Sequence, residues 1–70
     1  MTNETKIAMF KWTEREYSSC NTAEDLHNAI HACWAYRAAL IEVEKYSEVK
    51  FCCKADSYFF EKTLKRVFNK

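Results

Sequence analysis

Two stretches of the chain carry patterns of apolar residues that are typical of β-strands. Residues 5–13 (TKIAMFKWT) are apolar on both alternating sets of positions, with two lysines interrupting them. This pattern predicts a strand that is covered on both faces along much of its length. Residues 48–54 alternate instead, with Val49, Phe51 and Cys53 on one side. That alternation predicts a half-exposed strand.

The clearest local signal is the start of a helix after Cys20. Thr22 followed by Asp25 forms the pattern of a capping box, and Asn21 followed by Glu24 offers the same pattern one residue earlier. Beyond it, apolar side chains recur at helical spacing along one face. These positions are Leu26, Ile30, Cys33, Leu40 and Ile41.

The end of this helix is open between two alternatives. In the first, the helix continues to Tyr46, which the alanine-rich sequence around Ala38 favours. In the second, it stops near Ala39, and residues 40–44 begin a strand. We favour the long helix.

A last helix is expected to begin with Asp56 as its cap. Its predicted apolar face, which would dock onto the sheet, consists of Phe60, Leu64, Val67 and Phe68. The predicted order is therefore β-α-β-α. We expect residues 1–70 to form a single small α+β domain, with a two- or three-stranded sheet packed against one long helix and a shorter C-terminal helix.

The composition narrows the class of protein further. The 70 residues include no Gly and no Pro, which excludes the glycine-rich loops that bind nucleotide phosphates. No signal peptide and no apolar run of membrane-spanning length is visible, so we predict a cytoplasmic protein that does not interact with a membrane. In that compartment the four cysteines are expected to be reduced, with several packed as small hydrophobic side chains.

No pattern of catalytic or metal-binding residues stands out. His27 and His31 have the four-residue spacing with which two imidazoles can share a metal ion, but cysteine ligands at the usual zinc spacing are missing. Cys33 lies on a different helical face from both histidines, so it lacks a general base within reach. We therefore expect a protein that is not an enzyme and that holds neither a metal nor a cofactor.

The middle of the long helix supplies the first candidate contact surface. Arg37 interrupts the apolar face, so its charge must be paired or must reach solvent. Trp34 and Tyr36 flank that face, and Trp, Tyr and Arg are the residues enriched at the energetic centres of protein interfaces. We interpret this trio as the preferred protein-binding patch, although for Trp34 taken by itself we favour aromatic packing in the core over binding.

The C-terminal part of the chain supplies the second candidate surface. Residues 49–70 carry six basic and two acidic side chains, whereas residues 1–48 carry five basic and eight acidic ones. Lys62, Lys65 and Arg66 share the face of the last helix opposite its apolar stripe, which is a possible track for a phosphate backbone. A net charge of +1 argues against a dedicated nucleic-acid-binding protein.

A chain this short, rich in aromatic residues and without catalytic residues resembles the accessory proteins that bacteriophages encode to block host or defence proteins. The resemblance is one of size and composition, and it assigns no residues. It favours an interaction module that binds and inhibits or modulates a larger protein, and self-association into a homo-oligomer is also open. The alternative is a small nucleic-acid-binding module that uses the basic C-terminal helix.

Overall fold

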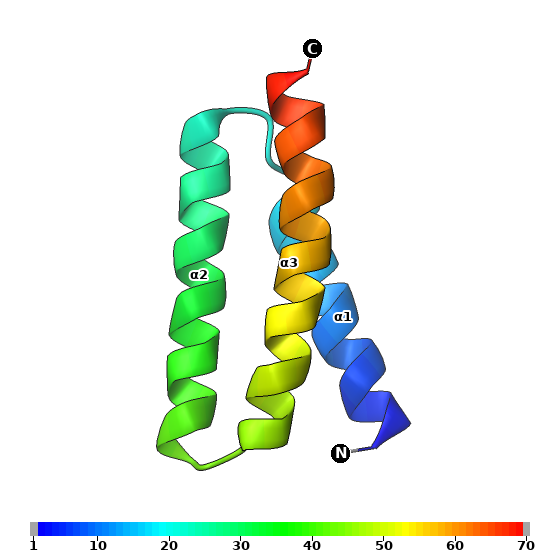
Figure 1. Ribbon diagram of the computed structural model, residues 1–70, viewed down its shortest axis with the longest axis vertical. Helices are drawn as coiled ribbons and strands as arrows, with labels where there is room; N and C mark the ends of the chain where they lie inside the picture. The colour runs from blue at the N-terminus through cyan, green and yellow to red at the C-terminus, as the bar shows by residue number, and fades with distance from the viewer. Residues whose placement is uncertain (1, 70) are drawn as a thin grey trace.

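The computed structural model describes residues 2–69 and contains three helices (Figure 1). They are α1 (Asn3–Ser18), α2 (Ala23–Glu42) and α3 (Tyr46–Phe68). No strand occurs within the described residues. The predicted α+β architecture with its β-α-β-α order is therefore wrong, and the chain is an all-α protein.

The three helices run up, down and up, joined by short connections (Figure 1). Each helix contacts both of the others, and α3 packs along both α1 and α2. The molecule is flat, with principal-axis extents of 39 × 22 × 14 Å. A flat bundle of three helices leaves a large part of each helix in contact with solvent.

The first predicted strand, residues 5–13, lies within α1. The residues that α1 buries are Met9, Thr13 and Tyr17, which are spaced by four and so lie on one face of a helix. Thr13 is a polar member of this face, and its hydroxyl donates to the carbonyl of Met9 at 2.9 Å. The buried Thr13 is polar, and several of the apolar residues in this segment are exposed. The pattern of apolar residues therefore does not show the helical period.

The capping box at the start of α2 is confirmed. The Thr22 side chain accepts from the backbone of Asp25, whose carboxylate accepts from the backbone of Thr22 in return. The prediction of a long helix is also confirmed, although α2 ends at Glu42 and not at Tyr46. The alternative strand over residues 40–44 is wrong.

The turn after α2 uses a left-handed residue without glycine. Glu44 has φ of 58°, and the amides of Glu44 and Lys45 donate to the carbonyls of Ile41 and Leu40. This is the hydrogen-bond pattern of a Schellman motif, in which glycine is the usual left-handed residue. The chain therefore reverses direction between α2 and α3 within three residues.

The second predicted strand, residues 48–54, belongs to α3, so Asp56 lies inside this helix and does not cap it. The predicted docking face of the last helix is largely wrong as well. Leu64 and Phe68 are exposed, and Phe60 is only partly buried against the core. The residues of α3 that are buried are Cys52, Ala55, Phe59, Thr63 and Val67.

The core is small and combines short side chains with a few large ones. Its central cluster consists of Tyr17, Cys20, Leu26, Ala29, Cys33 and Phe59. Three of the four free cysteines are buried, which confirms that most of them pack as small hydrophobic residues. None of the helices formed by residues 2–69 combines the length and the apolar character that a membrane crossing needs.

The buried face of α3 predicts opposite outcomes for two phenylalanines. Phe59 is 6% exposed and lies with its ring centre 4.8 Å from that of Phe10, so Phe59→Ala should lower the free energy of unfolding by about 3–5 kcal/mol. Phe68 is 58% exposed, so Phe68→Ala should change it by less than about 0.5 kcal/mol. Urea unfolding of both variants measures the difference. Equal losses would show that α3 docks through a different face.

Candidate functional site

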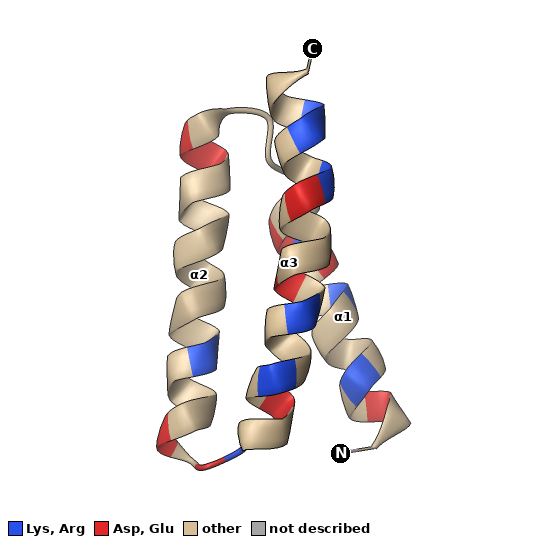
Figure 2. Cartoon of the chain, viewed as in Figure 1, with Lys and Arg blue, Asp and Glu red and all other residues tan. Residues whose placement is uncertain are grey.

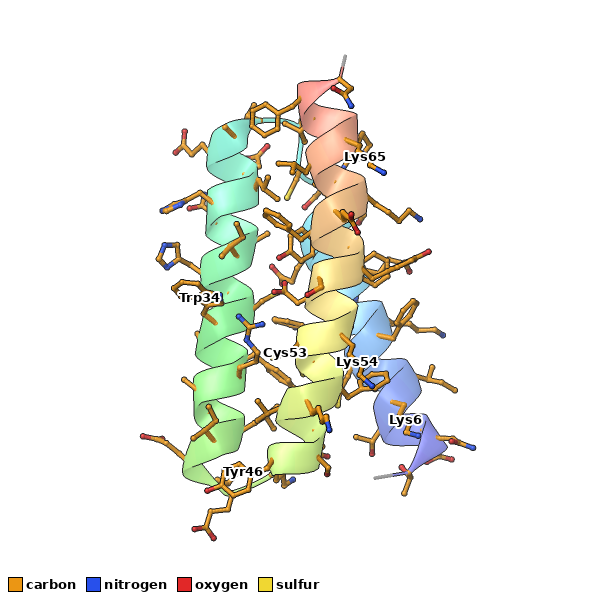
Figure 3. The ribbon with its side chains drawn as sticks, viewed as in Figure 1. Lys6, Trp34, Tyr46, Cys53, Lys54 and Lys65 are labelled. Atoms are coloured by element: carbon orange, nitrogen blue, oxygen red, sulfur yellow. The ribbon has the colours of Figure 1, made fainter. Side chains whose placement is uncertain are left out.

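One side of α2 is exposed along the whole helix, and we call it the outer α2 face. Trp34 projects from it on the side away from α3 (Figure 3), and its side chain is 58% exposed. Ile41, near the end of the helix, is 50% exposed. The residues of this face are Glu24, His27, Asn28, His31, Trp34, Ala35, Ala38, Ala39, Ile41 and Glu42.

The outer α2 face is uncharged between its two ends. Glu24 and Glu42 are acidic, and no Asp, Glu, Lys or Arg of this face lies between them. Figure 2 shows the contrast with α1 and α3, on which acidic and basic residues are spread along the helix. Arg37 is the only such residue from 26 to 41, and it points toward α3 instead.

Small and large side chains alternate on the outer α2 face. The indole of Trp34 lies with its centre 6.0 Å from the ring of His31, which in turn is 4.4 Å from the ring of His27. Beside Trp34, Ala35 and Ala38 contribute only methyl groups. The face therefore has a row of three rings next to small alanine side chains. Ridges of large side chains beside small ones are what helices use to pack against each other.

The three residues of the predicted protein-binding patch are not brought together on one surface. Tyr36 stacks on Trp12 of α1, with ring centres 4.9 Å apart and an angle of 25° between the planes. Arg37 donates from Nη1 to Asp56 of α3 at 3.1 Å and is therefore a paired charge. Trp34 alone faces solvent, so the favoured prediction for this residue, packing in the core, is wrong.

Asp56 connects all three helices. One of its carboxylate oxygens accepts from the hydroxyl of Tyr17 on α1, and the other accepts from Arg37 on α2. Burial, and next the hydrogen bond to Asp56, raise the pKa of Tyr17 well above its usual value. The Tyr17 hydroxyl therefore stays protonated and continues to act as the donor.

Two buried thiols next to this junction are also held in their neutral form. Burial raises the pKa of Cys33 to about 12, and the negative charge of Asp56 adds to the effect. Burial likewise raises the pKa of Cys52 to about 11, with a smaller contribution from Cys53 beside it. Since the thiolate is the nucleophilic form, neither residue is suited to covalent catalysis near neutral pH.

The predicted basic face of α3 is divided in the structure. Arg66 turns back and donates to the carbonyls of Cys20 and Tyr17 at 2.6 and 3.0 Å, which satisfies the end of α1. Lys62 lies with its nitrogen 5.2 Å from the centre of the Tyr58 ring. Lys65 is exposed. One of the three cations is therefore committed to holding α3 against the end of α1.

His27 and His31 are neighbours on α2, as their spacing predicts. Within residues 2–69, however, no group of three or more His, Cys, Asp and Glu side chains lies close enough together to hold a metal ion.

No family model, curated protein or solved structure matches the chain, so these comparisons do not indicate its role.

Three small or aliphatic residues of the outer α2 face, Ala35, Ala38 and Ile41, were not among the predicted site residues. A signal for them is present in the sequence, because residues 26–41 contain one charged residue besides two histidines. An uncharged stretch of that length is compatible with burial as well as with an interface. The helix boundaries were needed before these positions could be assigned to an exposed face.

The different surroundings of Arg37 and Trp34 predict different effects of truncation. Arg37→Ala leaves the largely buried carboxylate of Asp56 without its cation, so we expect a loss of about 2–4 kcal/mol in the free energy of unfolding. Trp34→Ala removes an exposed side chain and should change it by less than about 0.5 kcal/mol. Thermal and urea unfolding of both variants test this. A Trp34→Ala variant as unstable as Arg37→Ala would mean that Trp34 supports the fold.

The raised pKa values of the buried thiols predict a loss of stability at alkaline pH. Between about pH 9 and pH 12 an unfolded chain has released protons that the folded chain retains at Cys33 and Cys52, so the free energy of unfolding should fall as pH rises. Each thiol contributes a slope of up to about 1.4 kcal/mol per pH unit. Below pH 9 both states hold these protons and the contribution is constant. Urea unfolding across this range should show a shallower fall for Cys33→Ala, and an unchanged slope would contradict the assignment.

Proposed function

We propose that this chain is a protein-interaction module that binds a larger protein through the outer α2 face and so inhibits or modulates it. The observation that carries the proposal is the exposure of Trp34 at the centre of a helix face that has no charged residue between Glu24 and Glu42. The proposal keeps the class of function predicted from the sequence. It replaces Tyr36 and Arg37 as contact residues with Ala35, Ala38 and Ile41.

The make-up of the outer α2 face fits a protein contact. The centres of protein interfaces are depleted in charged residues and enriched in aromatic ones, while their rims are polar. Trp34 lies at the centre of this face, and Glu24 and Glu42 lie at its two ends. An exposed tryptophan between small side chains is also the type of residue that carries much of the binding energy in an interface.

The nucleic-acid alternative has less support. Arg66 is engaged with backbone carbonyls of Tyr17 and Cys20, and an arginine in that position is not available to a phosphate. The exposed Lys65 and the Lys62 that lies over Tyr58 leave a sparse cationic track. Contacts to several phosphates are what give nucleic-acid binding its affinity.

The proposal is of a binding protein without a catalytic step, acting in the cytoplasm. Its support is chemical: Cys33 and Cys52 are buried with raised pKa values, and they serve packing rather than nucleophilic chemistry. All four cysteines are free, which fits a reducing compartment.

Affinity capture with substituted chains tests the proposal. Ala38→Glu places a charge beside Trp34, and Trp34→Ala removes the indole. Each of these two variants, tested separately, should weaken the binding of a larger protein partner by about tenfold or more. Binding should persist after nuclease treatment. The measurement is partner recovery across a range of concentrations, with circular dichroism to confirm that each variant is folded.

Lys65→Glu is the matched control, because it changes an exposed residue on a different helix. It should change affinity little, since charges outside the centre of an interface mainly affect association rate and salt dependence. The proposal fails if folded Trp34→Ala and Ala38→Glu both retain the wild-type affinity. Loss of binding with Lys65→Glu and with nuclease would instead establish the nucleic-acid alternative.

A further inference from the structure

A hollow lies between α1 and α3, away from the outer α2 face. Its volume is about 380 Å³, near the lower end of the range of about 300–1,000 Å³ that is usual for small-molecule pockets. The hollow therefore suits a ligand that is smaller than a nucleotide. Its lining includes, from the two helices in turn, Glu14, Tyr17, Phe59, Lys62, Thr63 and Arg66.

The hydroxyl of Thr63 distinguishes this hollow from a mere gap between helices. Thr13 and Thr63 are the buried polar residues of the described chain, at 2% and 4% exposed. The Thr13 hydroxyl donates to the carbonyl of Met9, whereas that of Thr63 forms no hydrogen bond with any of residues 2–69. Buried polar groups in proteins are nearly always bonded, so a hydroxyl left open calls for a partner from outside the chain.

The Thr63 hydroxyl opens onto the hollow. Among the fully enclosed side-chain oxygens and nitrogens of the described residues, only one of Glu48 lacks a hydrogen-bond partner. The unbonded oxygen of Thr63 is therefore not sealed in the core, and the hollow that this residue lines is the space it reaches. A hydroxyl can donate one hydrogen bond and accept others there.

The rest of the hollow combines an apolar floor with opposite charges on its two helices. Phe59 and Tyr17 are 6% and 1% exposed and form the floor. Glu14 of α1 and Lys62 of α3 are exposed at the rim, and neither belongs to an ion pair of the described residues. The Lys62 nitrogen lies 5.2 Å from the centre of the Tyr58 ring, an attraction that holds the ammonium beside the hollow.

We propose that this hollow binds a free α-amino acid with an apolar side chain. The carboxylate of the ligand accepts from the Thr63 hydroxyl and from the Lys62 ammonium. The ammonium of the ligand donates to Glu14, and its side chain packs on the ring of Phe59. Hydrogen bonds to charged groups are the stronger ones, and this ligand class supplies a charged group to each helix.

Other small ligands satisfy fewer of these groups. A nucleotide needs several available cations, but Arg66 donates to backbone carbonyls at 2.6 and 3.0 Å, which leaves Lys62 among the lining residues. A simple carboxylic acid would leave Glu14 unpaired next to a negative ligand, and a simple amine would leave Lys62 and Thr63 unpaired. Within a peptide the backbone amino and carboxyl groups are amides without charge, so a free amino acid is the matching form.

Titration of the full chain with L-phenylalanine, followed by two-dimensional NMR of the backbone amides, tests the proposal. We expect saturable shifts within residues 14–18 and 59–66, with the amides of the outer α2 face unchanged. Two analogues each lack one charged group: 3-phenylpropionate has no ammonium and phenethylamine has no carboxylate. Each should bind about threefold more weakly or worse, which is the scale of one exposed ion pair.

Substitutions assign the contacts. Thr63→Val keeps the shape of the side chain but removes the hydroxyl, and it should weaken L-phenylalanine by about tenfold, whereas Thr63→Ser should retain most of the affinity. Glu14→Gln and Lys62→Met should each weaken it by about threefold or more. Glu61→Gln and Lys65→Met are the matched controls, because both residues are exposed on α3 outside the hollow. Circular dichroism confirms that each variant is folded.

The proposal is overturned if L-phenylalanine gives no saturable shifts at these amides, or if either analogue binds as tightly as the amino acid. It is equally overturned if folded Thr63→Val binds with wild-type affinity, or if the control substitutions weaken binding as much as those in the hollow. Because the hollow and the outer α2 face share no residue, these results leave the proposed function untouched.

Discussion

The carboxylate of Asp56 is the contact on which the arrangement of the three helices depends. It belongs to α3, accepts from Tyr17 of α1 and from Arg37 of α2, and its side chain is only 16% exposed. A charge in such surroundings is costly unless it is paired and hydrogen-bonded. The core around it combines short side chains such as Ala29 and Cys33 with a few large ones such as Phe59. The polar junction fixes how the helices are placed along one another.

The exposed side of α2 lacks charged residues in its middle because Arg37 is directed into this junction. Arg37, the one charged side chain in the middle of α2, turns inward to Asp56, so the opposite side of the helix retains no charge between Glu24 and Glu42. The flat shape of the bundle prevents α1 and α3 from covering that side. The Arg37–Asp56 ion pair therefore leaves an uncharged helix face with Trp34 at its centre. Exposed faces of this kind on small proteins commonly bind other chains.

The local signal at the start of α2 was interpreted correctly, whereas the predicted cap at Asp56 and the patterns that depend on tertiary context were not. The Thr22–Asp25 capping box and the long helix after it involve residues close in sequence, and both are confirmed. Residues 5–13 and 48–54 were assigned to strands because segments of seven to nine residues fit either period. The first segment also ends on the polar but buried Thr13, and the second has Cys52 as its one fully buried residue. The lack of Gly and Pro favoured uninterrupted helices and was given too little weight. In the predicted site, Trp34 is exposed as a contact residue should be, whereas the partners of Arg37 and Tyr36 lie on other helices and left no mark in the local sequence.

The two tryptophans of the chain occupy very different surroundings. Trp12 is partly buried and stacked on Tyr36 between α1 and α2, while Trp34 stands in solvent on the outer α2 face. Indole fluorescence depends on the polarity around the ring, so the two residues should emit at different wavelengths and differ in their access to a dissolved quencher. The protein thus carries two built-in optical reporters: one follows the packing of the first two helices, and the other responds whenever the outer α2 face is covered.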